Sequence, residues 1–282
     1  MAKNVLIGWP NRAPGAVLSG GSWTTLGNLN NSDYWRVARS TSTSTSNTAI
    51  NIDIGRATDL RVVALAAHNL SLSATWRIKL GTTAGSGDVY DSGSVAVWAM
   101  TFGGAYSWAD QFAWDGAGGA DDYTGSPYLA CLPLPTQYNA RYARVEITDT
   151  SNPAGYVQIG KLFIGGGIQP AIGAGYGGLS ESWVDGSERI AGFSLEESFL
   201  ARRRLRQAQC QFQHLDAGYE FRALYEMQRR QGLSGEVLFL PEPTSVAECQ
   251  RRGFLGRLAE LSEIEYPHYR HRSMTVRIKE TP

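Results

Sequence analysis

Alternation of apolar and polar residues is the feature that most limits how this chain folds. Apolar side chains occupy every second position in three runs of the first half, at residues 50–54, 76–80 and 143–147. A period of two places these side chains on one face of a strand. Clusters of Gly, Ser, Asn and Asp separate the runs, and no stretch of the first half shows a convincing helical period. The first half is therefore predicted to be an antiparallel β-sandwich.

A glycine-rich stretch divides the chain into two parts. Seven of the fourteen residues from 165 to 178 are glycine, a density that neither a helix nor a strand is expected to tolerate. Seven of the eight tryptophans precede residue 170, whereas the shorter remainder holds more of the charged residues. We predict a β-sandwich at 1–167, a linker at 168–178 and a second domain at 179–282. The linker is expected to let the two domains settle independently.

The second domain begins with a strand and a helix. Apolar residues alternate with glutamines around residue 210, which predicts a strand with one polar face. The glutamines are Gln207, Gln209, Gln211 and Gln213. Asp216 is expected to cap a helix of about four turns. This helix ends at Gly232 and carries the i,i+4 pair Glu226 and Arg230 on its polar side.

Three further strands complete the second domain. They are predicted at 236–240, 254–261 and 274–279, where apolar residues again alternate or form short runs. The order of elements indicates a small antiparallel sheet or barrel with one helix packed on it, an α+β unit. The whole chain is therefore predicted to be mainly β.

The overall charge excludes a general affinity for polyanions. Lys and Arg total 26, as do Asp and Glu, so the formal net charge is zero. We predict no specific binding of nucleic acid and no binding to membranes. No apolar stretch approaches the roughly 18 to 20 residues that span a bilayer. The apolar segment that ends at Pro10 is too short for a signal peptide, so folding in a cytoplasm is expected.

Motifs for cofactors and redox chemistry are weak. The three cysteines, Cys131, Cys210 and Cys249, form no C-x-x-C pair, so reduced and buried thiols are expected. Residues 155–161 have the spacing of a phosphate-binding loop but lack its Ser or Thr. Residues 173–178 fit G-x-G-x-x-G, but a proline precedes them where a strand is required. We therefore predict no cofactor.

Metal-binding and catalytic residues are equally sparse. His268 and His271 are three residues apart, which places them on opposite faces of an extended segment and argues against shared coordination. Asp121 and Asp122 are adjacent carboxylates, but they lie in a glycine-rich segment typical of a solvated loop. We predict no metal site and no enzymatic activity.

Aromatic residues gather in one glycine-rich segment of the first half. Their spacing is too irregular to place all of them in a core. The candidates for contact with a ligand or partner are Trp98, Tyr106, Trp108, Trp114 and Tyr123. Two interpretations are open: exposed rings that stack on sugars or on another protein, or rings that plug the ends of the sandwich.

Arginines form clusters in the second half, and glutamates lie close to each cluster. Mixed charge of this kind favours an interface between proteins over binding of nucleic acid. The candidate interface residues are Arg204, Arg229, Arg230, Arg251 and Arg252.

The strand patterns of the first half resemble those of a known fold. Residues 51–55, 60–69 and 76–79 are similar to the early strands of discoidin-type, galactose-binding-like jelly rolls, and 141–147 and 156–165 are similar to their closing strands. The resemblance covers most of residues 1–167 and implies a jelly roll. Members of this family bind sugars, lipid head groups or only other proteins.

The second half resembles structural proteins of tailed bacteriophages. Residues 219–240, 256–258 and 274–280 are similar in pattern to the sheet-plus-helix unit of tail-tube and distal-tail proteins, which form the tail tip or baseplate hub. The resemblance implies a ring of copies that continues the tube, with the tail tube and hub as further partners and the virion as the location. In such a ring the glutamine-rich strand, 204–214, is expected to line a water-filled lumen.

The sequence therefore leads to two hypotheses of different classes. The first is a non-enzymatic virion protein that forms a ring, with an outward jelly-roll module. The alternative is a carbohydrate-binding protein that recognises a host-surface glycan through its loop aromatics.

Overall fold

The protein is mainly β, as predicted. The computed structural model describes residues 5–98, 129–174, 178–191, 197–216, 218–267 and 271–281. A 14-stranded antiparallel sheet runs through both halves of the described chain. Its main path is β12 (Leu179–Val184), β15 (Leu205–Asp216), β19 (His271–Glu280), β17 (Phe254–Leu258), β16 (Glu236–Leu240), β1 (Leu6–Asn11), β11 (Lys161–Ile168), β5 (Ile50–Ala66), β9 (Leu129–Thr148), β6 (Thr75–Gly81) and β7 (Tyr90–Asp91).

Short elements complete the structure. Off the main path, β2 (Val17–Ser19) pairs with β5, β8 (Val95–Ala96) with β6, and β18 (Ile264–Glu265) with β19. Two separate sheets are β10 (Gln158–Ile159), β4 (Ala38–Ser40) and β3 (Trp23–Thr24), and β13 (Glu188–Ala191) with β14 (Glu197–Leu200). The helices among the described residues are α1 (Thr45–Thr48), α3 (Tyr219–Gln231) and α4 (Val246–Arg252), with short 3₁₀ turns at Ala13–Gly15 and Leu26–Asn30.

The N-terminal half is the predicted β-sandwich. Strands β5, β9 and β6 form one layer, and the β10, β4 and β3 sheet packs against it over a common apolar core. The alternation read from the sequence has its expected cause, because Trp76, Ile78 and Leu80 all point into this core. Apolar burial of this extent is the main stabilising term for such a layer.

The C-terminal half packs α3 on strands β15, β19 and β16. Phe212 from β15 meets Leu224 and Met227 from α3 in a second core. The helix ends at Gly232, as predicted, but Gly218 rather than Asp216 occupies its N-cap position. Asp216 instead ends β15, and its carboxylate accepts a hydrogen bond from the backbone N–H of Gly218 at 2.8 Å.

The C-terminal half contains a further helix, α4, that was not predicted. It is only seven residues long, so its sequence shows no clear period. The Ser245 hydroxyl accepts a hydrogen bond from the backbone N–H of Glu248 and caps the helix. The strand predicted at 254–261 begins at Phe254 as expected but ends earlier, at Leu258.

Three glycines of the predicted division lie inside strand β11, so the expectation that no strand tolerates them was wrong. Gly165 to Gly167 lie against β1, and a Cβ atom at Gly165 would lie 2.0 Å from the carbonyl oxygen of Pro10. A Cβ atom at Gly167 would lie 2.7 Å from Leu6. The glycines are therefore required by the close approach of two strands.

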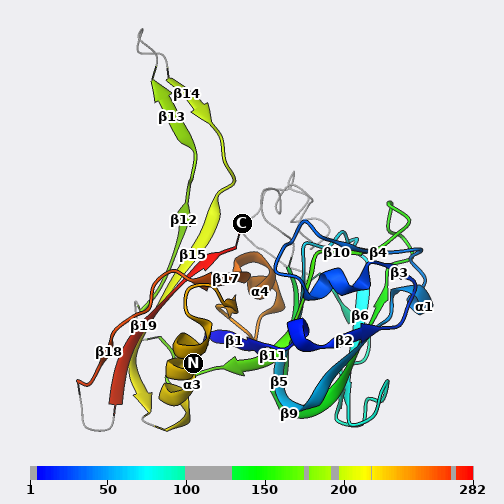
Figure 1. Ribbon diagram of the computed structural model, residues 1–282, viewed down its shortest axis with the longest axis horizontal. Helices are drawn as coiled ribbons and strands as arrows, with labels where there is room; N and C mark the ends of the chain where they lie inside the picture. The colour runs from blue at the N-terminus through cyan, green and yellow to red at the C-terminus, as the bar shows by residue number, and fades with distance from the viewer. Residues whose placement is uncertain are drawn as a thin grey trace, which may run out of the picture.

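Strand β1 joins the two halves, so they do not settle independently. Ile7 lies opposite Ile168 of β11 on one side and opposite Phe239 of β16 on the other. A third apolar cluster mixes residues of both halves, and Lys161 of β11 forms a nearly buried ion pair with Glu236 of β16 at 2.6 Å. Figure 1 shows the resulting continuous body, with one hairpin that projects from it.

Candidate functional site

The projecting hairpin is the most unusual feature of the structure. Strands β12 and β15 pair up to Val184 and Leu205, and the chain continues outward as the ribbon of β13 and β14 (Figure 1). We call residues 183–191 and 197–204 the arm. A two-stranded hairpin without further support is only marginally stable in water. Among the described residues, no further strand pairs with the ribbon of β13 and β14.

Large apolar side chains of the arm are exposed to solvent. The exposed fractions are 62% for Trp183, 57% for Ile190, 62% for Phe199 and 52% for Leu200. Register places Glu188 opposite Leu200 and Arg189 opposite Phe199, so Leu200 and Ile190 share one face and Phe199 lies on the other. Full burial of one such side chain stabilises a complex by about 1.5–3 kcal/mol. Both faces of the arm can thus contribute to an interface.

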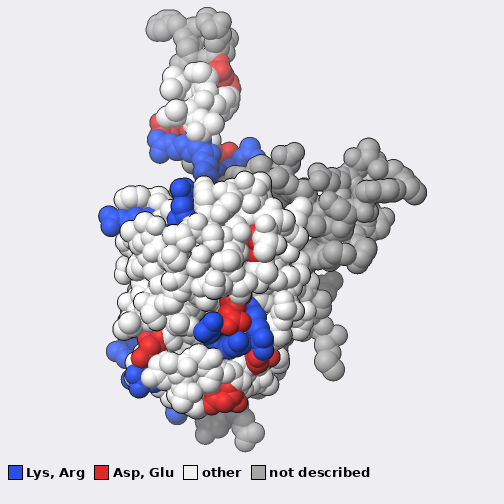
Figure 2. All heavy atoms as spheres, turned by 90° about the vertical axis from the view of Figure 1, so that its right-hand side faces the viewer, with Lys and Arg blue, Asp and Glu red and all other residues white. Residues whose placement is uncertain are grey.

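Charged side chains of both signs accompany these apolar groups. Arg189 pairs with Glu197, Arg202 with Glu188, and Arg204 with Asp185 at 3.3 Å. Figure 2 shows basic and acidic side chains together where the arm leaves the body. Exposed pairs of this kind contribute little stability.

The Asp185 carboxylate at the base of the arm is held in its ionised form. Hydrogen bonds from Ser187, followed by the interaction with Arg204, lower the pKa of Asp185 below its usual range. The turn at the start of the arm therefore keeps its negative charge at neutral pH.

A buried ion-pair cluster fixes the point from which the arm departs. The Glu280 side chain is 1% exposed, and its carboxylate accepts hydrogen bonds from Arg203 at 2.8 Å and from Arg206 at 2.7 Å. The backbone N–H of Arg206 donates to the same carboxylate at 2.9 Å. Arg206 also donates to the carbonyl oxygen of Gly253 at 3.0 Å. The first residues of β15 are therefore tied to β19 and to the end of α4.

The glutamine-rich strand has the polar face that the sequence predicts. Gln211 and Gln213 are exposed, and Gln207 and Gln209 are partly covered, whereas the apolar side chains between and beyond them are buried: Ala208, Cys210, Phe212 and Leu215. Gln209 accepts a hydrogen bond from Arg277 of β19 at 2.9 Å. The polar face therefore extends across neighbouring strands.

The predicted arginines do not form one patch. Arg204 lies in the arm, whereas Arg229 and Arg230 both pair with Glu226 on the exposed side of α3. Arg251 is exposed on α4, and Arg252 joins α4 to β12 through Glu181 at 2.8 Å. The structure thus brings three of the five near the arm and its base: Arg204, Arg251 and Arg252.

Among the predicted aromatics, Trp98 is not exposed. Its ring is buried, its indole N–H donates to the carbonyl oxygen of Leu70 at 3.2 Å, and its edge contacts His68 with ring centroids 5.4 Å apart. Burial lowers the pKa of His68 to about 3, so this imidazole is neutral at physiological pH. Tyr106, Trp108, Trp114 and Tyr123 lie outside the described residues.

The arm's apolar residues were missed at the level of sequence. Trp183 is the only tryptophan after residue 170, and it lies among charged and polar residues. A large aromatic residue in such a segment is a signal for an exposed contact, and it was the one readable indication of the arm.

The described residues include neither a candidate metal site nor a candidate membrane-spanning helix. Within the described ranges, no group of three or more His, Cys, Asp or Glu side chains is placed to hold a metal ion. His268 lies outside those ranges, and His271 contacts His214 edge to face at 5.7 Å. No helix of the described chain has the length and apolar character needed to cross a bilayer.

Comparison with known proteins does not assign this chain to a family. No protein-family model and no curated protein matches the chain. Among solved structures, it is similar to the lectin binding domain of lectinolysin in complex with Lewis b, with 12% identity, a TM-score of 0.36, and coverage of 57% of this chain and 98% of that one.

The chain is also similar to a carbohydrate-binding module and to part of a fucosidase. The family 32 carbohydrate-binding module of NanJ from C. perfringens, in complex with galactose, is 8% identical with a TM-score of 0.36 and coverage of 56% of this chain and 98% of that one. A GH29 fucosidase of Ruminococcus gnavus in complex with fucose is 11% identical with a TM-score of 0.35, and the match covers 56% of this chain but 26% of the fucosidase. At these TM-scores the likeness assigns no ligand.

Proposed function

We propose that this protein is a non-enzymatic structural component of a phage tail tip or baseplate. Copies form a ring that joins the tail tube to the tip, and the N-terminal jelly-roll module faces outward. The observation that carries this proposal is the arm, a two-stranded ribbon that leaves the body with large apolar side chains exposed on both faces. The protein is assembled in the bacterial cytoplasm and acts in the virion.

The arm supports a contact between copies that repeats around an axis. A head-to-tail contact uses two different surfaces, and it closes a ring when the rotation divides the circle. The arm is one such surface, and it finds its stability by lying on the next copy. The polar face of β15, with Gln211 and Gln213 exposed, is suited to a water-filled lumen.

The test is the oligomeric state of the full-length protein, alone and mixed with the tail-tube and hub proteins. For the assembled protein, light scattering after gel filtration is expected to give a mass several times that of the 30.7 kDa monomer. The double variant Ile190→Ser and Phe199→Ser is expected to stay monomeric, because it removes apolar contact from both faces of the arm.

A matched control distinguishes the arm from general surface hydrophobicity. Trp35 and Leu72 are exposed apolar residues of the N-terminal half, so Trp35→Ser with Leu72→Ser removes similar side chains elsewhere. This control is expected to assemble normally. A wild-type protein that stays monomeric in every mixture contradicts the proposal.

The second candidate is recognition of a host-surface glycan through the loop aromatics. Trp98 is excluded from this function by its burial, which leaves Tyr106, Trp108, Trp114 and Tyr123 as the residues to test. The observation that favours it is the gathering of these four rings in one glycine-rich segment. A glycan array with the full-length protein tests this candidate, and Trp108→Ala is expected to remove any binding that depends on stacking.

A further inference from the structure

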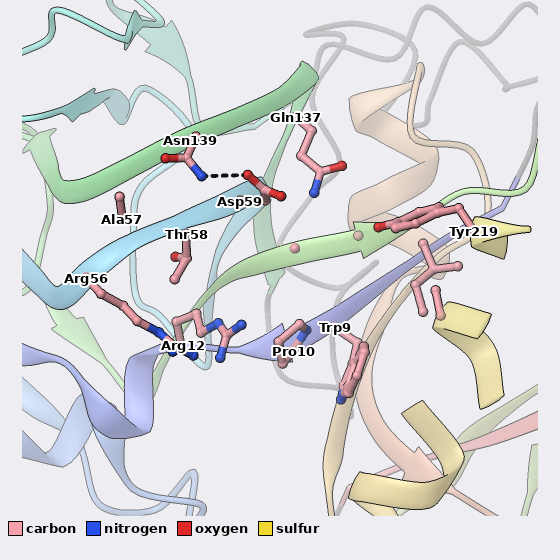
Figure 3. Close-up of a pocket in the computed structure, with 14 residues that line it drawn as sticks. Trp9, Pro10, Arg12, Arg56, Ala57, Thr58, Asp59, Gln137, Asn139 and Tyr219 are labelled. Carbon is pink, nitrogen blue, oxygen red and sulfur yellow. Dashed lines mark hydrogen bonds between the residues drawn. The ribbon is translucent and has the colours of Figure 1, made fainter. Parts of the chain in front are cut away.

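A pocket of about 360 Å³ lies where the two halves of the protein meet. Its walls come from the end of β1, the middle of β5, β9, the glycines of β11 and the start of α3 (Figure 3). None of the residues that line it belongs to the arm, so a ligand in this pocket does not require the ring.

The pocket exists because two strand pairings are interrupted beside it. The register of β5 against β9 shifts between Asp53 and Thr58, and that of β1 against β11 shifts between Gly8 and Asn11. Gly166 forms part of the wall, where a Cβ atom would lie 2.9 Å from the carbonyl oxygen of Trp9. Backbone rather than side chains therefore borders this part of the cavity.

One end of the pocket is basic. Figure 3 shows the side chains of Arg12 and Arg56 together at this end. Burial, followed by the charges of Arg56 and Arg230, lowers the pKa of Arg12. Within the part of the chain that the structure describes, neither Arg12 nor Arg56 forms an ion pair with a carboxylate. Two neighbouring guanidinium groups without a counter-ion favour an anion.

Three residues that line the cavity also carry unpaired polar atoms. The Trp9 indole nitrogen, Nε of Arg12 and the Thr58 hydroxyl are buried, and none has a hydrogen-bond partner among the described residues. Buried polar atoms are normally paired, so this part of the structure has more donors than acceptors.

The other end of the pocket suits hydroxyl groups. The Asp59 carboxylate accepts a hydrogen bond from Asn139 at 2.8 Å, and Gln137 lies beside this pair across from the arginines (Figure 3). The exposed ring of Tyr219 completes the rim. Carboxylate and amide groups bind hydroxyls, and an aromatic ring stacks on the face of a sugar.

We propose that this pocket binds a sugar that carries a carboxylate, such as a hexuronate unit of an acidic polysaccharide. The carboxylate lies at Arg12 and Arg56, the hydroxyls at Asp59, Asn139 and Gln137, and the ring face toward Tyr219.

Calorimetry with the full-length protein tests the proposal. Sodium glucuronate and galacturonate are titrated beside glucose, galactose and sodium acetate at the same ionic strength. Saturable binding of a uronate, at least tenfold tighter than that of the neutral sugars or acetate, is expected. The proposal would be overturned if a uronate bound no more tightly than its neutral sugar or than acetate. It would also be overturned if no uronate bound.

Two variants locate the site. Arg56→Gln is expected to weaken uronate binding about tenfold or more, because it removes a charge-assisted contact, and Arg56 is exposed enough to be replaced without loss of the fold. Tyr219→Ala is expected to weaken binding without a change of charge. Arg36→Gln removes the same charge from an exposed site in the N-terminal half and is expected to bind normally. Unchanged affinity in both pocket variants would also overturn the proposal.

Discussion

Replacement of Glu280 by Gln is expected to destabilise the protein strongly, because this carboxylate is the shared acceptor at the base of the arm. Its side chain is 1% exposed and lies between the guanidinium groups of Arg203 and Arg206, which are 34% and 10% exposed. The substitution keeps the size of the side chain and removes its charge. Arg206 would then remain nearly buried without an anion.

The expected loss of stability follows from the burial of Arg206, which is left without a counter-charge. Removal of one member of a buried ion pair costs about 3–5 kcal/mol, since the other charge is then uncompensated. Two contacts reduce the effect only in part: Gln can still accept from the backbone N–H of Arg206, and Arg206 keeps its hydrogen bond to Gly253. We therefore expect the free energy of unfolding to fall by about 3 kcal/mol or more.

Urea unfolding followed by circular dichroism measures this loss. Glu226→Gln is the matched control, because Glu226 also binds two arginines but lies on the exposed side of α3. Screening by solvent makes the loss of such a pair small. If the two variants lose similar stability, burial of the Glu280 cluster does not strengthen it, and the reasoning about the base of the arm is wrong.

Two other perturbations test the interior of the structure. The pKa of His68 is about 3 in the folded protein and about 6.5 when unfolded, so the unfolded chain binds the extra proton between these values and stability falls as the pH falls. From pH 7 to pH 5 this effect is expected to lower the free energy of unfolding by about 2 kcal/mol. Urea unfolding at both pH values measures the difference. The His68→Gln variant should lack this part of the pH dependence. Gly165→Ala is expected to cost about 1–3 kcal/mol, because its Cβ atom would meet the carbonyl oxygen of Pro10, whereas Gly27→Ala, with nothing within 4 Å, should cost little in the same assay. Equal stability of the two glycine variants would refute the close-approach argument.

The strands could be predicted because burial of one face leaves a direct record in the sequence. The run at 236–240 is a strand with the predicted limits, and 76–80 and 143–147 lie within β6 and β9. β6 and the 143–147 part of β9 bury one set of alternating side chains in the N-terminal core, and this burial of one face causes their period of two. β16 is buried on both faces, in the second and third apolar clusters, so its sequence is a continuous apolar run.

The glycine-rich region was misjudged because its cause is distant in the chain. Conformational freedom alone favours a linker, but Gly165 contacts Pro10, which lies far away in the sequence. Nothing within a window around residue 165 reveals that β1 will approach so closely. The same limitation applies to Trp98, for which the sequence left both an exposed and a buried position open; the structure buries it beside Leu70 and His68.

The sequence predicted the polar face of β15 but not the exposed apolar side chains of the arm. The glutamines of β15 indicated a hydrated face because polar side chains alternate with a buried set. Ile190 and Phe199, by contrast, have the residue types of a core, and only the projection of the arm shows that solvent surrounds them. Exposed apolar residues cannot be told from buried ones by type alone.

The continuous sheet changes what the arm can do in an assembly. β15 carries the arm at one end and pairs with β19, which connects through β17 and β16 to β1 and the sandwich. In the ring that we propose, a neighbouring copy that holds the arm would act on a body whose two halves share hydrogen-bonded strands and the buried pair of Lys161 and Glu236. A flexible tether would let the N-terminal module take any direction. A shared sheet would instead give every copy in such a ring the same orientation of that module, and with it the same orientation of the pocket at the junction.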